Sequence, residues 1–249
     1  MSLPFGLDPG LAAVLGVALF VAAFVRGYSG FGFSAVFIAF AALLTNPLPL
    51  IPVVFLCEIL MTAVQARGIR GAVDWRRAGL MLIGAALAVP LSVLALSHAS
   101  PETARLVVSA IIGCLSLVLL IGWQLRRPLG AAGQVSVGIA SGLANGAGVG
   151  GLPVAALLAA QPIPAAMFRA TLVVYITGLD LMTLPIMGVA GLVSGQTLLA
   201  AAMALPILTA GILLGGRHFL AASPQAFRRS AVLLLLVLAV LGVTRALLS

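Results

Sequence analysis

The chain has 249 residues, of which 63% are hydrophobic and only 7% are charged, and its mean hydropathy is +1.27. A soluble domain needs about a quarter of its residues charged to cover its surface, so this composition excludes a water-soluble fold. Several apolar runs approach the ~20 residues that cross a bilayer as a helix. The ten-residue alternating pattern of an outer-membrane barrel is absent. The sequence therefore predicts an all-α polytopic membrane protein.

The formal net charge of +8 comes from arginine alone, because all 13 basic residues are Arg. Most of them lie in short gaps between apolar runs, where basic residues orient membrane proteins. No basic face or base-stacking motif accompanies them, so nucleic acid is not an expected partner. The two cysteines, Cys57 and Cys114, lie inside apolar runs and are expected to be small buried hydrophobes.

Ten apolar segments follow one another along the chain, separated by Gly, Pro and charged residues. We expect helices over approximately 11–25, 31–45, 48–66, 78–97, 104–123, 134–144, 152–161, 165–188, 197–216 and 227–247. The pairs 11–25/31–45 and 134–144/152–161 are short and interrupted by glycines. An eleven-residue helix covers only about 16 Å, half of the hydrocarbon core. Each pair is therefore predicted to be a re-entrant hairpin that dips into the membrane.

The halves 1–125 and 126–249 carry similar landmarks in the same order, within a single transmembrane domain. A glycine-rich stretch precedes a Pro-x-Pro element in each half: Arg26–Gly32 before Thr45–Pro49, and Ser141–Gly148 before Ala160–Pro164. A Ser-Pro pair follows in each half, Ser100-Pro101 and Ser223-Pro224, and is typical of a capped helix start. The sequence therefore predicts a divergent repeat of five helical segments per half.

The positions of the arginines invert between the two halves. Loop 67–77 carries four arginines and its counterpart 188–196 carries none, whereas loop 98–103 has none and its counterpart 217–229 has three. Basic loops face the cytoplasm, so the halves are predicted to be inverted repeats in a bacterial inner membrane, with both termini outside. Inverted repeats with interrupted helices place a substrate site near the midplane, where the two hairpin tips are expected to meet.

Helices predicted to begin after Gly32 and after Gly151 would leave backbone N–H groups unpaired at the tips, and converging helix starts favour an anion. Arg26 lies at the first tip and offers a guanidinium fork that suits oxyanions. The candidate substrate-binding residues are Arg26, Gly27, Ser29, Gly30, Phe31, Gly32, Asn145, Gly146, Gly148, Gly150 and Gly151. Two alternatives stay open: Arg26 snorkels to a surface, and the glycines serve close helix packing.

Glu58 and Asp180 are the acids embedded in full apolar spans, in corresponding third segments. Buried carboxyl groups in membranes often relay protons, which makes these two candidates for proton coupling. The alternative is a structural role, with Glu58 paired to Arg26 and Asp180 bonded to a hydroxyl such as that of Thr177. Arg169 is interpreted as an orientation charge rather than a ligand.

Motifs for soluble catalysis are not found in this sequence. There is no metal-ligand spacing, phosphate-binding loop or nucleophile elbow, and the loops are too short for a catalytic domain. We therefore expect neither an enzyme nor a cofactor.

The stretch from Gly142 to Pro153 resembles the duplicated glycine-rich motif of the sulfite exporter TauE/SafE family, and Arg26–Gly32 resembles its first-half copy. The likeness covers nearly the whole chain. It implies a secondary transporter of sulfur-containing oxyanions such as sulfite or organosulfonates, driven by ion gradients. The motif positions it implies are Gly30, Gly32, Gly146, Gly148, Gly150 and Gly151. Phe33 and Ser34 stand where further glycines are common.

The first functional hypothesis is an ion-coupled anion transporter that works by alternating access. Its partners would be a sulfite or sulfonate anion, the lipid bilayer, a coupling ion expected to be H⁺, and a second copy in a possible homodimer. The alternatives are a passive anion channel, which needs several weak sites along an open pore, and a membrane subunit that transports nothing. A transition-metal permease is disfavoured because the tips carry no Cys or Met pairs.

Overall fold

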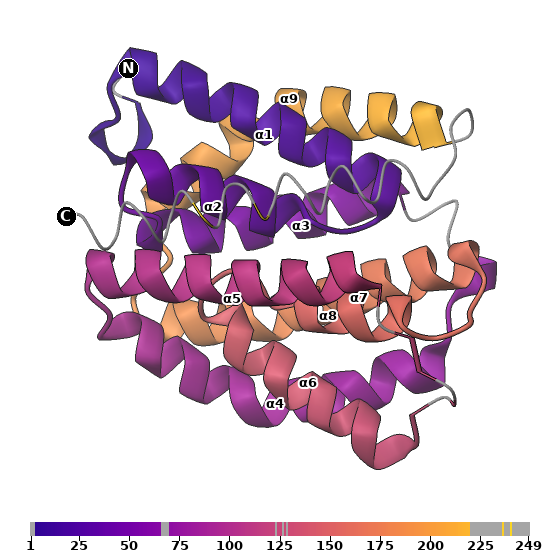
Figure 1. Ribbon diagram of the computed structural model, residues 1–249. Helices are drawn as coiled ribbons and strands as arrows, with labels where there is room; N and C mark the ends of the chain where they lie inside the picture. The colour runs from indigo at the N-terminus through magenta and orange to yellow at the C-terminus, as the bar shows by residue number, and fades with distance from the viewer. Residues whose placement is uncertain are drawn as a thin grey trace.

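A computed structural model describes residues 3–65, 70–122, 124, 125, 127, 129–219, 236 and 240. The described residues form nine α-helices and three 3₁₀ turns, and no strand (Figure 1). The helices are α1 Pro9–Ser29, α2 Phe33–Leu44, α3 Ile51–Gln65, α4 Trp75–Ser97, α5 Pro101–Ile121, α6 Ala131–Asn145, α7 Gly151–Ala159, α8 Ala165–Val189 and α9 Gly195–Phe219. The 3₁₀ turns are η1 Pro4–Gly6, η2 Leu48–Leu50 and η4 Arg70–Ala72.

The first nine predicted segments are confirmed as helices. Six described helical stretches are long and apolar enough to cross a bilayer: Pro9–Ser29, Leu48–Gln65, Trp75–Ser97, Pro101–Ile121, Ala165–Val189 and Gly195–Arg217. The protein is therefore a multi-pass membrane protein. The tenth predicted segment, 227–247, lies outside the described residues, as do Arg67, Arg126, Ser223, Pro224, Arg228 and Arg229.

The prediction that both helices of the first pair are short is wrong for α1, which has 21 residues and is about 31 Å long. The Asp8 carboxylate caps its start by accepting from the N–H groups of Gly10 and Leu11. The helix continues to Ser29 and ends at Gly30, whose left-handed φ of +83° favours glycine. The helices α2, α6 and α7, with 12, 15 and 9 residues, are shorter than the ~20 residues of a membrane span. The helix α3 also has 15 residues, but together with η2 it forms an apolar stretch of 18 residues, Leu48–Gln65.

The predicted Ser100 cap is confirmed at the start of α5. The Ser100 hydroxyl accepts from the N–H of Thr103 at 3.2 Å, and Pro101 occupies the first helical turn. Pro153 lies in the first turn of α7, where a missing N–H group costs no intrahelical hydrogen bond. Local sequence therefore determines where these two helices begin.

The closest helix crossings join the two halves of the chain. α1 packs along α9, and α4 packs along α6, as Figure 1 shows. Glycines lie at both crossings: a Cβ on Gly84 or Gly138 would overlap backbone between α4 and α6, and one on Gly215 would overlap the Phe24 carbonyl. Small residues allow membrane helices to approach this closely. Each crossing therefore depends on glycine in one half fitting backbone of the other.

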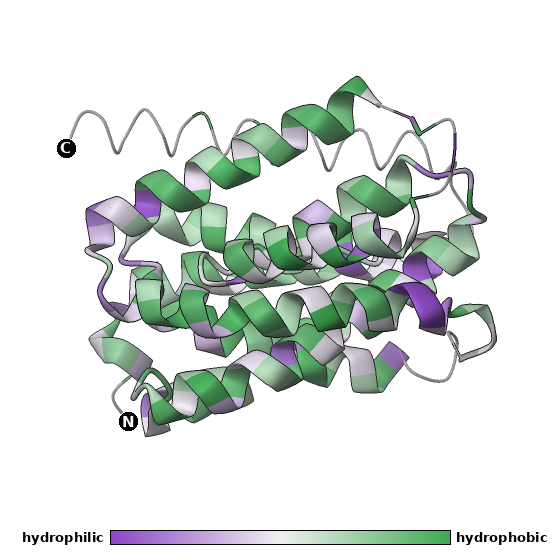
Figure 2. Ribbon diagram, turned by 90° about the horizontal axis from the view of Figure 1, so that it is seen from below, coloured by the Kyte–Doolittle hydropathy of each residue, from purple (hydrophilic) through white to green (hydrophobic). Residues whose placement is uncertain are grey.

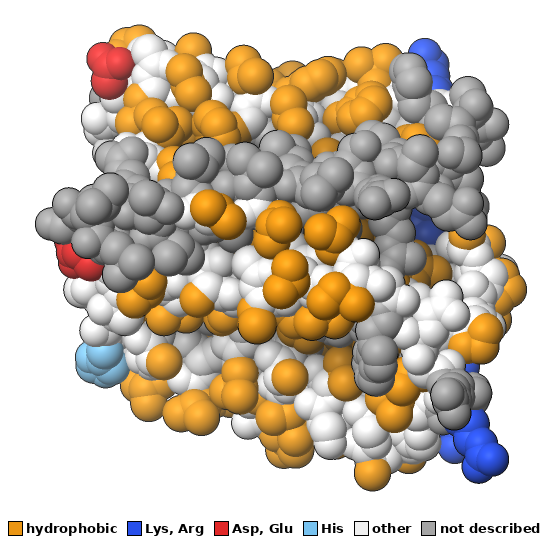
Figure 3. Space-filling model, viewed as in Figure 1, with side chains coloured by type: hydrophobic (Ala, Val, Ile, Leu, Met, Phe, Trp, Pro, Cys, Tyr) orange, Lys and Arg blue, Asp and Glu red, His pale blue; other side chains and the backbone are white. Residues whose placement is uncertain are grey.

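The helices are hydrophobic along most of their length, as expected for lipid contact (Figure 2). Exposed large hydrophobics recur along α4, among them Ile83, Leu87, Leu91 and Leu94. On the face seen in Figure 3, arginine side chains lie at one end of the helices, and acidic and histidine side chains lie at the other. The bundle thus has an apolar belt between two polar ends.

Candidate functional site

Arg26 lies one turn before the end of α1, at the point where the chain reverses into α2. The N–H of Gly30 donates to the Arg26 carbonyl at 2.8 Å, and Gly32, with φ of +89°, precedes the first residue of α2. The Arg26 side chain is completely buried, with 0% exposure. Snorkelling of Arg26 to a surface, one of the two open alternatives, is therefore wrong.

The Arg26 guanidinium is held by α3. Its Nη1 lies 2.7 Å from Glu58 Oε1 and its Nη2 donates to Thr62 Oγ1 at 2.9 Å. Its Nε is also buried and has no hydrogen-bond partner among the described residues. The pairing of Glu58 with Arg26, considered above as a structural role for Glu58, is confirmed.

The side chain of Glu58, which belongs to α3, faces the start of α2 as well as Arg26. The backbone N–H of Ser34, in the first turn of α2, faces the Glu58 carboxylate, and no side chain caps this helix start. Helix starts with uncapped N–H groups attract anions. A carboxylate of the chain itself therefore occupies the place where the sequence predicted an anion.

Asp180 approaches this pair from α8. It is 1% exposed and close enough to interact electrostatically with Glu58 and Arg26, yet neither carboxylate oxygen has a hydrogen bond of acceptable geometry to a described residue. The predicted bond from Thr177 to Asp180 is wrong, because the Thr177 hydroxyl instead lies 2.8 Å from that of Thr62. These five residues, Arg26, Glu58, Thr62, Thr177 and Asp180, form what we term the buried charge cluster.

The first glycine-rich turn is braced by the start of α8. Arg169 Nη2 donates to the Gly27 carbonyl at 2.8 Å, and a Cβ on Gly30 would lie 2.6 Å from Arg169 Cγ. The Phe31 ring meets Phe168 edge-on, with centroids 6.0 Å apart. The Ser29 hydroxyl bonds to carbonyls of its own turn. Arg169 therefore packs against the first turn rather than lying free in a loop.

The second glycine-rich turn is held by a separate polar network on α6 and α8. The Tyr175 hydroxyl donates to Ser141 Oγ at 2.7 Å, and Ser141 Oγ donates to the Gly150 carbonyl. Asn145 Nδ2 donates to Thr183 Oγ1 at 2.9 Å. A Cβ on Gly150 would lie 2.5 Å from Asn145 Oδ1, so this asparagine packs directly on the turn. The hydrogen bonds from Tyr175 to Ser141 and from Asn145 to Thr183 are both buried.

The predicted site glycines have different surroundings. Gly27 faces the backbone of Ile212 in α9, and Gly146 faces the backbone of Ser92 in α4. Close helix packing, the second open alternative, accounts for these two. Gly148, with φ of +75°, lies over Ile38, and Gly151 lies against α8.

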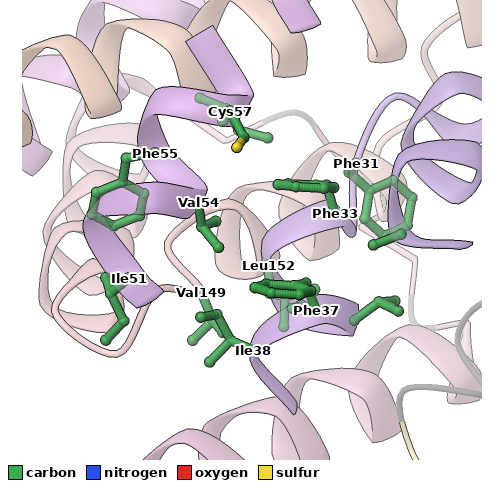
Figure 4. Close-up of a cluster of buried hydrophobic side chains, with 14 of the residues drawn as sticks. Phe31, Phe33, Phe37, Ile38, Ile51, Val54, Phe55, Cys57, Val149 and Leu152 are labelled. Carbon is green, nitrogen blue, oxygen red and sulfur yellow. The ribbon is translucent and has the colours of Figure 1, made fainter. Parts of the chain in front are cut away.

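The two turns lie at different levels of α8. The first packs against Phe168 and Arg169, and the second against Ile176 and Leu179. This separation of seven to eleven residues corresponds to roughly 10–16 Å along the helix. Apolar side chains fill the space around them, as Figure 4 shows for Phe31, Phe33, Phe37, Ile38, Ile51, Val54, Phe55, Cys57, Val149 and Leu152. The two turns therefore contact different levels of α8, and Asp180, near both Glu58 and Tyr175, lies between the two polar networks.

Sequence reasoning missed several polar partners in these networks. Thr62 is four residues after Glu58, and this spacing places both on one helix face. Thr183 is three residues after Asp180 and follows the same rule. The backbone of Ser34 and the hydroxyl of Tyr175 gave no local signal, because their partners are distant in the chain.

The chain matches a known protein family over most of its length. A family model described as sulfite exporter TauE/SafE matches residues 15–241. The chain belongs to this family. No curated protein and no solved structure matches the chain. TauE/SafE proteins are membrane transporters rather than enzymes, and the matched range contains both glycine-rich turns and the buried charge cluster. The resemblance drawn from the glycine motifs is confirmed.

Proposed function

We propose that this protein is a secondary transporter of small sulfur-containing anions, sulfite or organosulfonates, coupled to an ion gradient. The family supports a sulfite-type anion, and the completely buried Arg26 is the observation that carries the proposal. Burying a guanidinium in a membrane interior costs several kcal/mol, so such a residue is usually found where it has a charged partner or binds a substrate. Its fork, together with the uncapped N-terminus of α2, matches the oxygens of a sulfonate or sulfite. Of the residues first considered, Arg26 and the turn Gly30–Gly32 carry most of this proposal.

Alternating access by inverted repeats is the proposed mechanism. The helix pairs support it: the first helix of each half packs on the fourth helix of the other, α1 on α9 and α6 on α4. The third helices, α3 and α8, pack on each other and carry the acids Glu58 and Asp180. A two-fold arrangement of this kind allows one half to rock against the other around a central site.

Proton coupling through Glu58 and Asp180 completes the proposal. Both are buried beside Arg26, and their carboxyl groups lie close enough to share a hydrogen bond. Intramembrane carboxyl groups with these surroundings carry protons in many transporters. We further propose an inner-membrane location with both termini outside, in accordance with the arginine-rich end in Figure 3, and a homodimer as the oligomeric state.

Flux into proteoliposomes tests the proposal. Wild-type protein should give saturable uptake of labelled sulfite or ethanesulfonate that responds to an imposed pH gradient, whereas a channel would give flux without saturation. Arg26→Lys keeps a positive charge but loses the fork, and should lose at least tenfold in uptake. Arg77→Lys, in the partly exposed ion pair with Asp74, is the matched control and should transport normally. Absence of any sulfur-anion flux from wild type would contradict the proposal.

A further inference from the structure

The anion position of the predicted site is filled by Glu58. Its carboxylate lies 2.7 Å from Arg26 Nη1 and faces the N–H of Ser34 at the start of α2. These are the same two donors that a transported oxyanion would use. Both cannot bind these donors at once, because Arg26 and Glu58 are enclosed by protein, with exposures of 0% and 2%.

The single positive charge of the cluster can neutralise only one ionised carboxylate. Arg26 supplies one positive charge and Glu58 one negative charge. Asp180 is buried within the field of both, and neither of its oxygens accepts a hydrogen bond from a described residue. A second unpaired carboxylate charge in an apolar interior is costly, so the neutral cluster holds one proton on the two acids.

We propose that Glu58 is a place-holder anion that the substrate displaces from Arg26, so that the displaced carboxylate takes up one proton for each monovalent anion bound. This inference rests on the proposed function and specifies its coupling. Before binding, the cluster contains the Arg26 cation, one carboxylate and one carboxylic acid. After binding, it contains the Arg26 cation, the substrate anion and two carboxylic acids. The proton comes from the same aqueous side as the anion.

Once Glu58 is displaced, the substrate anion accepts hydrogen bonds from the donors that Glu58 has left. The oxygens of a sulfonate can accept from Arg26 and from the Ser34 N–H, while the Thr62 hydroxyl still accepts from Arg26 Nη2 at 2.9 Å and donates to the Glu58 carbonyl. Unprotonated Glu58 would then be a buried charge without a partner, a state that costs several kcal/mol. Anion entry without a proton is thereby suppressed. Net direction follows from the combined proton and anion gradients.

The other titratable groups near the cluster are few among the described residues. Cys57 is adjacent to Glu58 on α3, Arg169 interacts with Arg26 from α8, and Tyr175 interacts with Asp180. Tyr175 is held by Ser141, and Arg169 by the Gly27 carbonyl. The two carboxyl groups are therefore the groups of this cluster that can exchange a proton at moderate pH.

Calorimetric binding of ethanesulfonate between pH 5 and 8 tests the inference, because a sulfonate remains an anion over this range. Uptake of one proton per anion predicts an affinity that weakens about tenfold for each pH unit over the range in which Glu58 is ionised before binding and protonated after it. A pH indicator in weak buffer should register one proton bound per ethanesulfonate. This second measurement uses wild-type protein only, and so does not depend on any variant folding.

Variants locate the proton. Removing Glu58 alone would leave Asp180 to replace it beside Arg26, so the test variant is Glu58→Gln/Asp180→Asn, whose affinity should not vary with pH. Asp180→Asn alone should keep the tenfold slope, because Glu58 remains to be displaced. Glu102→Gln, an exposed carboxyl at the start of α5, is the matched control and should also keep it.

Two results would overturn the inference while leaving the proposed function intact: wild-type binding that does not vary with pH, or a slope abolished by Asp180→Asn alone. Failure of wild-type protein to bind either ethanesulfonate or sulfite at any pH would instead overturn the proposed function itself. The two failures are therefore distinguishable in one series of titrations.

Discussion

Removing the Arg26 charge should strongly destabilise the protein. Arg26→Gln leaves the Glu58 carboxylate buried at 2% exposure without its 2.7 Å partner, and also removes the bond to Thr62. Breaking a buried ion pair by removing one partner costs about 3–5 kcal/mol. Two hydrogen bonds to a charged group, at about 1.5–3 kcal/mol each, give a similar total. We expect a loss of about 4 kcal/mol in the free energy of unfolding.

The double variant Arg26→Gln/Glu58→Gln removes both charges and should recover most of that loss, because two amides can bond to each other. Unfolding in mixed micelles, with an SDS titration followed by circular dichroism, measures each free energy. Arg77→Gln, in the partly exposed ion pair with Asp74 at 3.0 Å, is the matched control and should cost less than about 1 kcal/mol.

Equal stability of Arg26→Gln and Arg77→Gln would refute this reasoning, since it would mean that Arg26 reaches water. A double variant no more stable than Arg26→Gln would show that the loss comes from packing of the arginine side chain rather than from the unpaired carboxylate.

Further predictions concern helix packing, the second network and topology. Gly84→Ala should destabilise by about 1–3 kcal/mol because its Cβ would overlap α6, whereas Gly79→Ala on the same helix meets nothing within 4 Å and should be neutral or slightly stabilising; unfolding titrations compare the two. Tyr175→Phe removes a buried 2.7 Å hydrogen bond and should cost about 1 kcal/mol in the same assay. In a cysteine-free background, Ala99→Cys should react with an impermeant maleimide from outside intact cells and Gly71→Cys only after lysis; the reverse pattern would contradict the proposed orientation.

Much of the fold follows from short-range sequence. Apolar run length predicted ten helices, of which the first nine are confirmed, because a helix in lipid must satisfy its backbone internally and cover itself with apolar side chains. The Ser100 cap and the Pro153 start were also readable, since each depends on groups within one turn. The full length of α1 was not, because its ends depend on the Asp8 cap and on the φ of Gly30, two features outside the apolar run.

Long-range pairing could not be read in the same way. The pairing of Arg26 with Glu58 was only the structural alternative to proton coupling by Glu58, because a buried arginine and a snorkelling one look identical in a hydropathy profile. The bond from Thr177 went to Thr62 rather than to Asp180, since the neighbouring helix face decides which hydroxyl is nearest. The glycines Gly27 and Gly146 pack against distant helices that no local pattern identifies.

The sequence by itself determined that this protein spans a bilayer, which segments form helices, and that the chain belongs to the sulfite exporter TauE/SafE family. The lengths of apolar runs and the glycine motifs are local properties, so they can be recognised without knowing which segments are in contact. The tertiary structure alone decided that the two glycine-rich turns lie at different levels of α8 and that Glu58 lies against Arg26 and the start of α2. These depend on how α1, α3 and α8 align, and that alignment is fixed by side-chain packing between residues that are 32 positions apart for Arg26 and Glu58 and 142 apart for Gly27 and Arg169.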